Sequence, residues 1–237
     1  PGMNAAVRSV VRSALDRGIE CIGIRRGWSG LVNGDFYRMD SGSVSRIINR
    51  GGTILYTARS EEFRTAEGQA KAAGVCKLLG LDGIVAIGGD GTFRGAQELS
   101  KCGVSVVGIP GTIDNDIVCT DYSIGFDTAA NTAVECIDKL RDTMQSHERC
   151  AVVEVMGRHA GWLAASAALA SEYGAGPDLI YLPEVDFSMP KFIEDVKRVY
   201  AEKGYCIVAV SEGIHYEDGG FVSEAKVAAT DGFGHAQ

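Results

Sequence analysis

The sequence lacks a long apolar run, a signal sequence and an excess of basic residues. No stretch approaches the uninterrupted apolar length of a membrane helix, and no charged, apolar, small-residue signal opens the chain. The formal net charge is -8 at pH 7, whereas a general nucleic-acid binder needs a basic face to displace counterions from phosphates. These absences predict a cytoplasmic protein that binds neither membranes nor nucleic acid. Any phosphate that it binds must be held by a local group of residues rather than by a general basic surface.

The cysteines lack the spacing of a metal site or of a disulfide framework. No CxxC pair occurs, no histidine stands at zinc-ligand spacing, and the number of cysteines is odd. We therefore expect buried thiols in a reducing compartment. The cysteines are Cys21, Cys76, Cys102, Cys119, Cys136, Cys150 and Cys206.

Internal repeats, low-complexity tracts and Pro/Ser-rich linkers are also missing, and short apolar runs alternate with amphipathic stretches. This alternation is typical of parallel strands joined by helices. The runs are mostly continuous in Val and Ile, as expected for strands covered on both faces. The sequence thus predicts an α/β protein with mostly parallel sheets. The expected strands cover residues 21–24, 83–87, 104–109, 151–155, 179–182 and 206–210.

Two helices stand out in the second half of the chain. From Ser188, a plausible N-cap with Pro190 in the first turn, apolar residues recur at the spacing of one buried stripe. The stripe consists of Phe192, Ile193, Val196, Val199 and Tyr200. A longer helix is expected over residues 128–144, and the order of elements suggests a domain boundary near Phe126.

The first motif with chemistry is Gly88-Gly89-Asp90-Gly91-Thr92, between an expected strand and an expected helix. A glycine turn at this junction lets backbone N–H groups approach phosphate oxygens, and the helix N-terminus adds positive potential. Asp90 could then hold Mg²⁺ against those phosphates. The alternative is a tight turn whose glycines serve packing alone. No Gly-Lys-Ser/Thr follows, so the motif is not a Walker loop.

The second motif, residues 110–116 with the sequence PGTIDND, also follows an expected strand. Ligands of open parallel sheets bind beyond the carboxyl ends of strands, so we expect both motifs to border one crevice. Asp90, Asp114 and Asp116 would then supply a metal ligand and a base for an attacking hydroxyl, as phosphoryl transfer requires. Alternatively, the Asp and Asn residues only fill turns and helix caps.

The third motif is VMGRHAGW, residues 155–162, at the end of another expected strand. Gly157 and Arg158 could meet a phosphate, because a guanidinium fits phosphate oxygens bidentately. Arg158 could equally be a surface charge. His159 has no evident acid or base partner and is interpreted as structural, and Trp162 as a packing residue.

Together these motifs resemble the bacterial type of 6-phosphofructokinase. The resemblance includes the opening PGMNAAVRSVVRSAL, INRGGT at 48–53, the stretch ending in ARSEEFR, and SHER before the third motif, in the family's order. It implies two Rossmann-like three-layer αβα lobes: residues 1–125 as a nucleotide-binding lobe without its first strand, and residues 126–237 as a sugar-phosphate-binding lobe without its C-terminal part. The chain is thus expected to be incomplete at both ends.

The implied activity is transfer of the γ-phosphoryl group of MgATP to the C1 hydroxyl of fructose 6-phosphate, a step of glycolysis. Asp114 matches the base, with Thr112 and Asp116 beside it, and Asp90 matches the Mg²⁺ ligand. Arg149 matches an arginine that reaches the substrate of a neighbouring subunit, which implies a homo-oligomer, a tetramer or dimer, with shared sites. The remaining implied positions are Arg59, Gly89, Gly91 and Thr92 for the nucleotide and Met156, Gly157, Arg158, Glu212 and His235 for the sugar phosphate, with Arg158 also catalytic.

Glycines at 91 and 111 favour ATP as the donor. Pyrophosphate-using relatives usually carry Asp and Lys at these positions, and a side chain at Gly91 would fill space that the α-phosphate and adenosine need. Other features depart from the family: Ala229 stands where a substrate arginine is expected, and Gly174 replaces a glutamate of the effector site. Allosteric control is common in this family. The basic positions that bind a regulatory nucleotide in the family are matched here by Arg8, Arg12, Arg50 and Arg141.

Three other functions stay open. The protein could use pyrophosphate, or it could be a non-catalytic subunit that binds sugar phosphate and nucleotide without turnover. NAD kinases and diacylglycerol kinases also use a GGDGT turn, but they do not carry the TIDND and MGR stretches found here.

Overall fold

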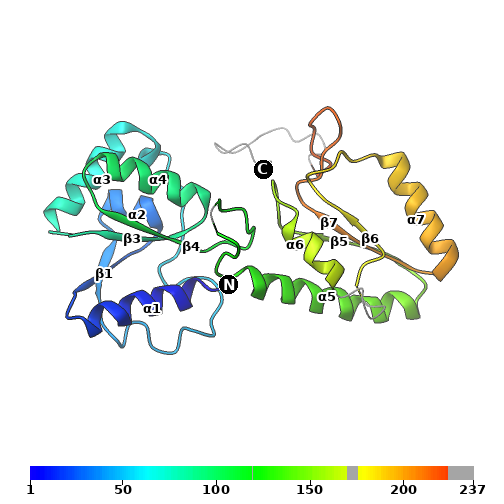
Figure 1. Ribbon diagram of the computed structural model, residues 1–237, viewed down its shortest axis with the longest axis horizontal. Coiled ribbons are helices and arrows are strands. Elements are labelled where there is room, and N and C mark those ends of the chain that lie inside the picture. Colours follow the sequence, from blue (N-terminus) through cyan, green and yellow to red (C-terminus); the bar gives the residue numbers. More distant parts are fainter. Residues whose placement is uncertain (119, 170–175, 224–237) are drawn as a thin grey trace. The chain divides into compact units, whose positions relative to one another are not determined.

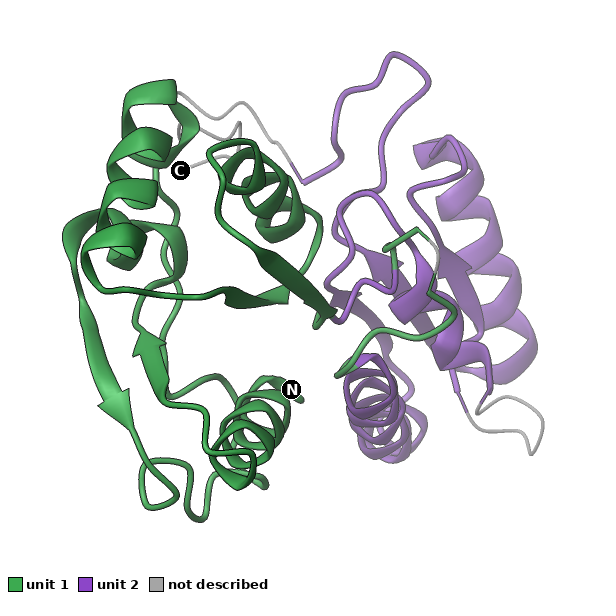
Figure 2. Cartoon of the chain, turned by 60° about the vertical axis from the view of Figure 1, so that its left-hand side comes forward, with its two compact units in different colours: residues 1–112, 116–125 green, residues 113–115, 126–237 purple. Residues whose placement is uncertain are grey.

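The computed structural model describes residues 1–118, 120–169 and 176–223 of the chain. These residues form two compact units (Figure 2). Unit 1 comprises Pro1–Thr112 and Asp116–Gly125, and unit 2 comprises Ile113–Asn115 and the chain from Phe126 onward. The assignment of nucleotide to residues 1–125 and of sugar phosphate to residues 126–237 stays a prediction.

Unit 1 is built on two pairs of strands. β1 (Cys21–Ile24) pairs antiparallel with β2 (Phe36–Met39), and β3 (Ile84–Gly88) pairs parallel with β4 (Val106–Pro110). The helical elements are α1 (Met3–Asp16), α2 (Gly27–Asn33), the 3-10 turn η1 (Glu62–Arg64), α3 (Ala66–Leu78) and α4 (Asp90–Lys101).

The core of unit 1 has two clusters on opposite sides of β3, because alternate residues of a strand point to opposite faces. Ile84 packs with residues of α2, α3 and α4, among them Leu31 and Leu99. Ile87 packs with residues of α1 such as Val7 and Val11. Helices therefore lie on both faces of the parallel pair, as Figure 1 shows.

Two local hydrogen-bonding devices hold segments of unit 1 in place. Buried Asn4 donates to the carbonyls of Arg50 and Gly51 (2.9 and 3.4 Å) and accepts from the N–H of Ile54 (2.8 Å), which anchors the loop at 50–54 to α1. Thr65 caps α3, because its hydroxyl accepts from the N–H of Gly68 (3.1 Å). Both devices satisfy backbone groups that would otherwise lack a partner.

Unit 2 is a three-layer αβα structure. Its sheet has the order β5-β7-β6, with β5 (Cys150–Val155), β7 (Cys206–Ser211) and β6 (Leu179–Tyr181) all parallel. One face packs against α7 (Met189–Lys203) through Val199, Val208 and their neighbours. The other face packs against α5 (Phe126–Ser146) and α6 (Trp162–Ser166), as Figure 1 shows. Ile137 of α5 is fully buried in this cluster.

The structure confirms the predicted α/β class with mostly parallel sheets, and each predicted strand overlaps an observed one. β2 was missed, and its antiparallel pairing with β1 departs from the parallel pattern. The expectation of strands covered on both faces was wrong for β3, β4 and β5, because Val85, Val107 and Val152 expose 43%, 64% and 59% of their surface. Hydrophobic runs report β propensity more directly than they report which face is covered.

Other packing expectations were wrong as well. In α7, Ile193 and Tyr200 are 44% and 42% exposed, so the buried stripe is narrower than the apolar spacing suggests. Ser188 occupies the N-cap position, but its side chain makes no capping hydrogen bond. Trp162 is 56% exposed. The described cysteines are all free, yet Cys102, Cys136 and Cys150 are exposed rather than buried. Among the described residues, no helix combines the length and the apolar character needed to cross a membrane.

Candidate active site

The glycine motif of unit 1 forms the junction between β3 and α4. Gly89 is the N-cap residue of α4, and Asp90 and Gly91 lie in its first turn, with their backbone N–H groups at the positive end of the helix. A Cβ on Gly88 would lie 2.4 Å from the Thr92 hydroxyl oxygen, so this glycine permits the tight return of the chain. A Cβ on Gly91 would meet no protein atom within 4 Å, which leaves the space beside this turn open.

The start of the second motif lies directly beside this junction. Gly88 and Pro110 are partners in the parallel register, and the N–H of Gly111 donates to the carbonyl of Gly88 (2.9 Å). A Cβ built on Gly89 would contact the Thr112 side chain at 3.5 Å. The sequence correctly placed these two loops at the same edge of the sheet, because the carboxyl ends of neighbouring parallel strands meet there.

The chain passes from one unit to the other within the second motif. Thr112 and Asp116 group with unit 1, whereas Asp114 groups with unit 2 together with its neighbours Ile113 and Asn115. Asn115 adopts a left-handed backbone with φ of 52°, which asparagine tolerates better than most residues. Asp114 is partly buried and has interaction partners in the structure.

In unit 2, the third motif and Glu212 meet at the carboxyl ends of β5 and β7. Val155 and Ser211 are register partners, and the N–H of Glu212 donates to the carbonyl of Val155 (3.0 Å). The Glu212 carboxylate accepts from the N–H of Gly157 (3.4 Å), and the buried Ser211 hydroxyl donates to the Gly157 carbonyl. Glu212 and the MGR turn therefore form one connected structure.

Gly157 cannot be replaced easily in this turn. Its φ of +139° lies in a region that residues with a side chain rarely adopt. A Cβ there would also lie 2.4 Å from the Ala160 carbonyl oxygen and 2.8 Å from the Ser211 hydroxyl. The glycine is thus required by backbone conformation and by space, and it sets the path of the chain into Arg158.

Arg158 lies beside an aromatic ring, and Met156 is open to solvent. The guanidinium carbon of Arg158 lies 4.4 Å from the centroid of the Phe221 ring, a cation–π contact, and the side chain has further interactions. Met156 is 59% exposed. A guanidinium can stack on an aromatic ring through its face and bind phosphate oxygens bidentately through its N–H groups.

Arg149 lies at the opposite end of β5 from Arg158. It precedes the first residue of the strand, and its carbonyl accepts from the N–H of Cys206 (3.3 Å). Six residues of strand separate the two arginines, which corresponds to about 20 Å. Within one copy of the chain, Arg149 therefore does not belong to the cluster of Arg158, Gly157 and Glu212.

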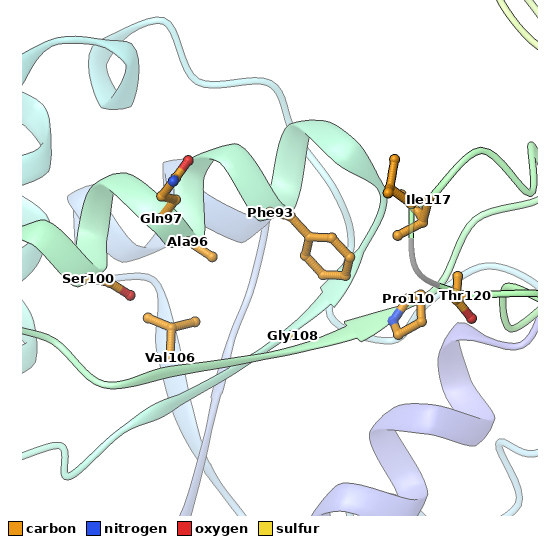
Figure 3. Close-up of a pocket in the computed structure, with 10 residues that line it drawn as sticks. Phe93, Ala96, Gln97, Ser100, Val106, Gly108, Pro110, Ile117 and Thr120 are labelled. Carbon is orange, nitrogen blue, oxygen red and sulfur yellow. The ribbon is translucent and has the colours of Figure 1, made fainter.

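The described residues of each unit line a pocket. In unit 1, residues of α4 and β4 together with Ile117, Val118 and Thr120 line an open pocket of about 420 Å³, with the Phe93 ring over Gly108 (Figure 3). None of the residues predicted to carry chemistry lines this pocket. In unit 2, a pocket of about 190 Å³ is lined by Glu212, Ser211 and a group of aromatic residues. Of these two pockets, the second alone is lined by a predicted site residue, Glu212.

The residues around Asp90 fit the way Mg²⁺ binds beside phosphates. Mg²⁺ commonly takes one or two protein carboxylates, with phosphate oxygens and water completing its shell. The Asp90 carboxylate is 57% exposed beside the α4 N-terminus and pairs with Arg94 (2.9 Å). Within the described ranges, no group of three or more His, Cys, Asp or Glu side chains is arranged to hold a metal ion. These residues therefore fit a Mg²⁺ ion that would be held by the Asp90 carboxylate and by the oxygens of a bound phosphate.

Some residues of the site escaped the sequence analysis, and others lie outside the described residues. Ser211 and Phe221 were missed, although a serine directly before Glu212 at a strand end was a usable signal for the first. Phe221 comes from a distant loop and had no local signal.

Arg59 is exposed in the segment before η1 and has partners in the structure. His235, Ala229, Gly174 and Cys119 lie outside the described residues.

Comparisons with known proteins match most of the chain. The family model described as phosphofructokinase matches residues 1–233. An ATP-dependent 6-phosphofructokinase from Halothermothrix orenii is 54% identical over 217 residues, which are 90% of this chain and 64% of that protein. One from Shouchella clausii is 53% identical, over 90% of this chain and 66% of that protein. The chain thus spans somewhat less than two thirds of the length of these relatives.

Solved structures of phosphofructokinases have the same fold. Phosphofructokinase from Saccharomyces cerevisiae has a TM-score of 0.80 and 34% identity, covering 94% of this chain and 33% of that one. The pyrophosphate-dependent phosphofructokinase from Nitrosospira multiformis has a TM-score of 0.82 and 26% identity, covering 92% of this chain and 59% of that one.

Proposed function

Since this chain belongs to the phosphofructokinase family, we propose that the full-length protein is an ATP-dependent 6-phosphofructokinase of the cytoplasm. It transfers the γ-phosphoryl group of MgATP to the C1 hydroxyl of fructose 6-phosphate, which yields fructose 1,6-bisphosphate and ADP in glycolysis. The observation that carries the proposal is the junction of β3 and α4 beside Thr112, an anion-binding helix start next to the loop that leads to Asp114.

The nucleotide phosphates bind at the β3–α4 junction in this proposal. Backbone N–H groups at Gly89, Gly91 and Thr92 face the phosphate oxygens at the helix N-terminus, and Arg59 adds positive charge. Asp90 would hold Mg²⁺ together with the phosphate oxygens, and the ion would supply positive charge beside the group that is transferred. The arrangement needs no covalent chemistry from the protein, because positioning and charge stabilisation supply most of phosphoryl-transfer catalysis.

Asp114 acts as the general base. An ionised carboxylate next to the C1 hydroxyl accepts its proton as the oxygen attacks the γ-phosphorus. Thr112 and Asp116 flank it and orient the hydroxyl. The reaction requires the donor phosphate held by the first motif to meet the hydroxyl beside Asp114.

The sugar phosphate binds at the carboxyl edge of the unit 2 sheet. Arg158 stacks on Phe221 and offers its N–H groups to the phosphate, while Gly157 and Met156 line the approach. Glu212 accepts hydrogen bonds from sugar hydroxyls, and His235 completes the set as the resemblance implies. Arg149 serves the site of a neighbouring copy, because its place at the other end of β5 separates it from Arg158. We therefore propose a homo-oligomer, a dimer or tetramer, with shared sites.

ATP is favoured over pyrophosphate by Gly91 and Gly111. The space beside Gly91 is open in the protein and suits a nucleotide rather than a side chain. At Gly111, a Cβ would lie 2.9 Å from the sulfur of Met3, so the lysine of the pyrophosphate users has no room without repacking. The pyrophosphate alternative remains worth testing, because solved pyrophosphate-dependent structures match this fold with TM-scores of 0.81 and 0.82.

The base is tested with Asp114→Ser in the full-length protein. We expect kcat to fall by about 10²–10⁴-fold while the affinity for fructose 6-phosphate stays similar, as for a lost general base. Asp82→Ser is the matched control, because Asp82 is an exposed aspartate in the turn before β3. An unchanged kcat removes Asp114 from the mechanism. Binding of both substrates by the parent protein without turnover would instead identify a non-catalytic subunit.

The donor is tested by comparing MgATP with pyrophosphate in a coupled assay. Gly91→Ala adds a Cβ that meets no protein atom, so the fold tolerates it, and Gly91→Asp extends further into the same space. We expect the aspartate variant to lose more kcat/KM with ATP than with pyrophosphate. An equal loss with both donors would undo the steric argument.

A further inference from the structure

Two cysteine thiols lie side by side at the edge of the unit 2 sheet that is opposite the candidate site. Cys150 begins β5, Cys206 begins β7, and the two residues are register partners in the parallel pairing. The N–H of Cys206 donates to the carbonyl of Arg149 (3.3 Å), so the strands are joined up to this end. Because register partners point to the same face of a sheet, both thiols lie on the α7 face.

The backbone spacing of this pair is compatible with a covalent bond between the sulfurs. Neighbouring strands lie about 4.8 Å apart, and the Cα atoms of disulfide-bonded cysteines lie about 4.4–6.8 Å apart. Cys150 lies close enough to contribute to the raised pKa of the Cys206 thiol. Rotation of the side chains, without a shift of the strands, is therefore the main change that a disulfide requires.

The two thiols differ in their access to solvent. Cys206 is 0% exposed and packs with Val199 and Val208 under α7. Cys150 is exposed, because α7 packs over β7 and β6 and leaves this part of β5 uncovered. Burial, followed by the nearby Cys150 and Asp178, raises the pKa of Cys206 to about 12, so this thiol keeps its proton at neutral pH. A dissolved oxidant therefore meets Cys150 first.

We propose that Cys150 and Cys206 form a reversible two-electron redox site, with Cys150 as the attacked thiol and Cys206 as the resolving thiol. The oxidant is a hydroperoxide. The proposal rests on strand register and burial and is independent of the proposed phosphoryl transfer.

The chemistry balances in two steps. The Cys150 thiolate attacks the peroxide, the O–O bond breaks, and sulfenic acid forms at Cys150 while the leaving hydroxide takes up a proton as water. The Cys206 sulfur then attacks the Cys150 sulfur, the S–O bond breaks, and the proton of Cys206 leaves with the hydroxide as a second water. Two thiols lose two electrons and the peroxide gains two. A dithiol reductant reverses the reaction by thiol–disulfide exchange.

Other cysteines provide matched controls. Cys102 follows the C-terminus of α4, and Cys136 lies on α5, so both are exposed but neither has a cysteine as a strand partner. Exposure by itself predicts that these thiols oxidise without an internal partner. A cross-link specific to Cys150 and Cys206 would distinguish a redox-active pair from two cysteines that are merely packed side by side.

The experiment treats the reduced full-length protein with hydrogen peroxide, blocks remaining thiols in denaturant and maps peptides without reduction. We expect a peptide pair that links Cys150 to Cys206, restoration of both thiols by dithiothreitol, and complete loss of the linked pair in Cys150→Ser. Cys102→Ser and Cys136→Ser should leave the linked pair unchanged. Cys206→Ala, a second variant, should leave Cys150 as sulfenic or sulfinic acid.

Two outcomes would overturn the proposal. In one, Cys206 stays fully alkylatable in denaturant while Cys102 and Cys136 are oxidised, which shows that the pair does not react. In the other, Cys150 proceeds to sulfinic acid in the native protein with no linked peptide, which shows that Cys206 does not resolve it.

Discussion

Replacing Gly157 with alanine should strongly destabilise unit 2, for two separable reasons. The φ of +139° is unfavourable for any residue with a side chain, and such backbone strain costs about 1–3 kcal/mol. The added Cβ would also overlap the Ala160 carbonyl oxygen at 2.4 Å and the Ser211 hydroxyl at 2.8 Å, and overpacking of this kind costs about 1–3 kcal/mol. Strain and overlap together should lower the free energy of unfolding by about 2–6 kcal/mol.

Gly204→Ala separates the two causes. Gly204 follows α7 with a φ of +78°, yet a Cβ there would meet no atom within 4 Å. This variant carries backbone strain without overlap and should cost only about 1–2 kcal/mol. The difference between the two variants therefore reports the overlap at Gly157 together with the additional strain of its φ.

Hydrogen–deuterium exchange of β5 and β7 amides is the appropriate assay, because a chain with two compact units need not unfold in one step. Gly157→Ala should accelerate exchange in both strands far more than Gly204→Ala does. Similar acceleration by the two variants would refute the reasoning, because it would mean that the turn relaxes around the added methyl group. Arg158 should then also keep its position over Phe221.

Three further predictions address stability. Asn4→Ala should cost about 2–3 kcal/mol in urea unfolding, because buried hydrogen bonds to the loop at 50–54 are lost. Asn4→Asp should cost more, because it buries a carboxylate oxygen against the carbonyl oxygens of Arg50 and Gly51; a smaller cost than that of Asn4→Ala would contradict this reasoning. Thr65→Ala should cost about 1 kcal/mol by removing the cap on α3, and Thr65→Ser should restore it. Burial and the nearby Asp195 raise the pKa of Tyr181 from 10.0 to about 12, so its contribution to stability is complete below pH 10 and declines as pH rises toward 12. Tyr181→Phe should flatten that decline in pH-dependent unfolding, and an unchanged slope would contradict the assignment.

The chemistry-bearing loops could be predicted because their signals are local. A run of β-forming residues followed by glycine and aspartate marks a strand end, and parallel strands bring such ends to one edge. This reasoning correctly placed the loops of Gly89 and Thr112 at the same edge. The contact of Gly157 with Glu212 was found only in the structure, because Glu212 was implied by the resemblance alone. The motif letters also carried the family resemblance, which the match over residues 1–233 confirms.

Burial could not be predicted in the same way, because it depends on what packs against each face. Val85 and Val107 read as core residues and are exposed, while the four-residue strand β2 has too few residues to show a period and was missed. The narrow stripe of α7 has the same cause, since the area of contact with β6 and β7 decides how many of its apolar residues are covered.

The residue types and their order in the chain were enough to identify the strand-end loops, the glycine turns and the family. The contacts of Arg158 with Phe221, the hydrogen bond from Ser211 to Gly157 and the pairing of Cys150 with Cys206 required the folded chain. Each joins residues more than fifty positions apart. Such pairs arise from strand register and loop packing, which depend on contacts across the whole unit rather than on any local stretch of sequence.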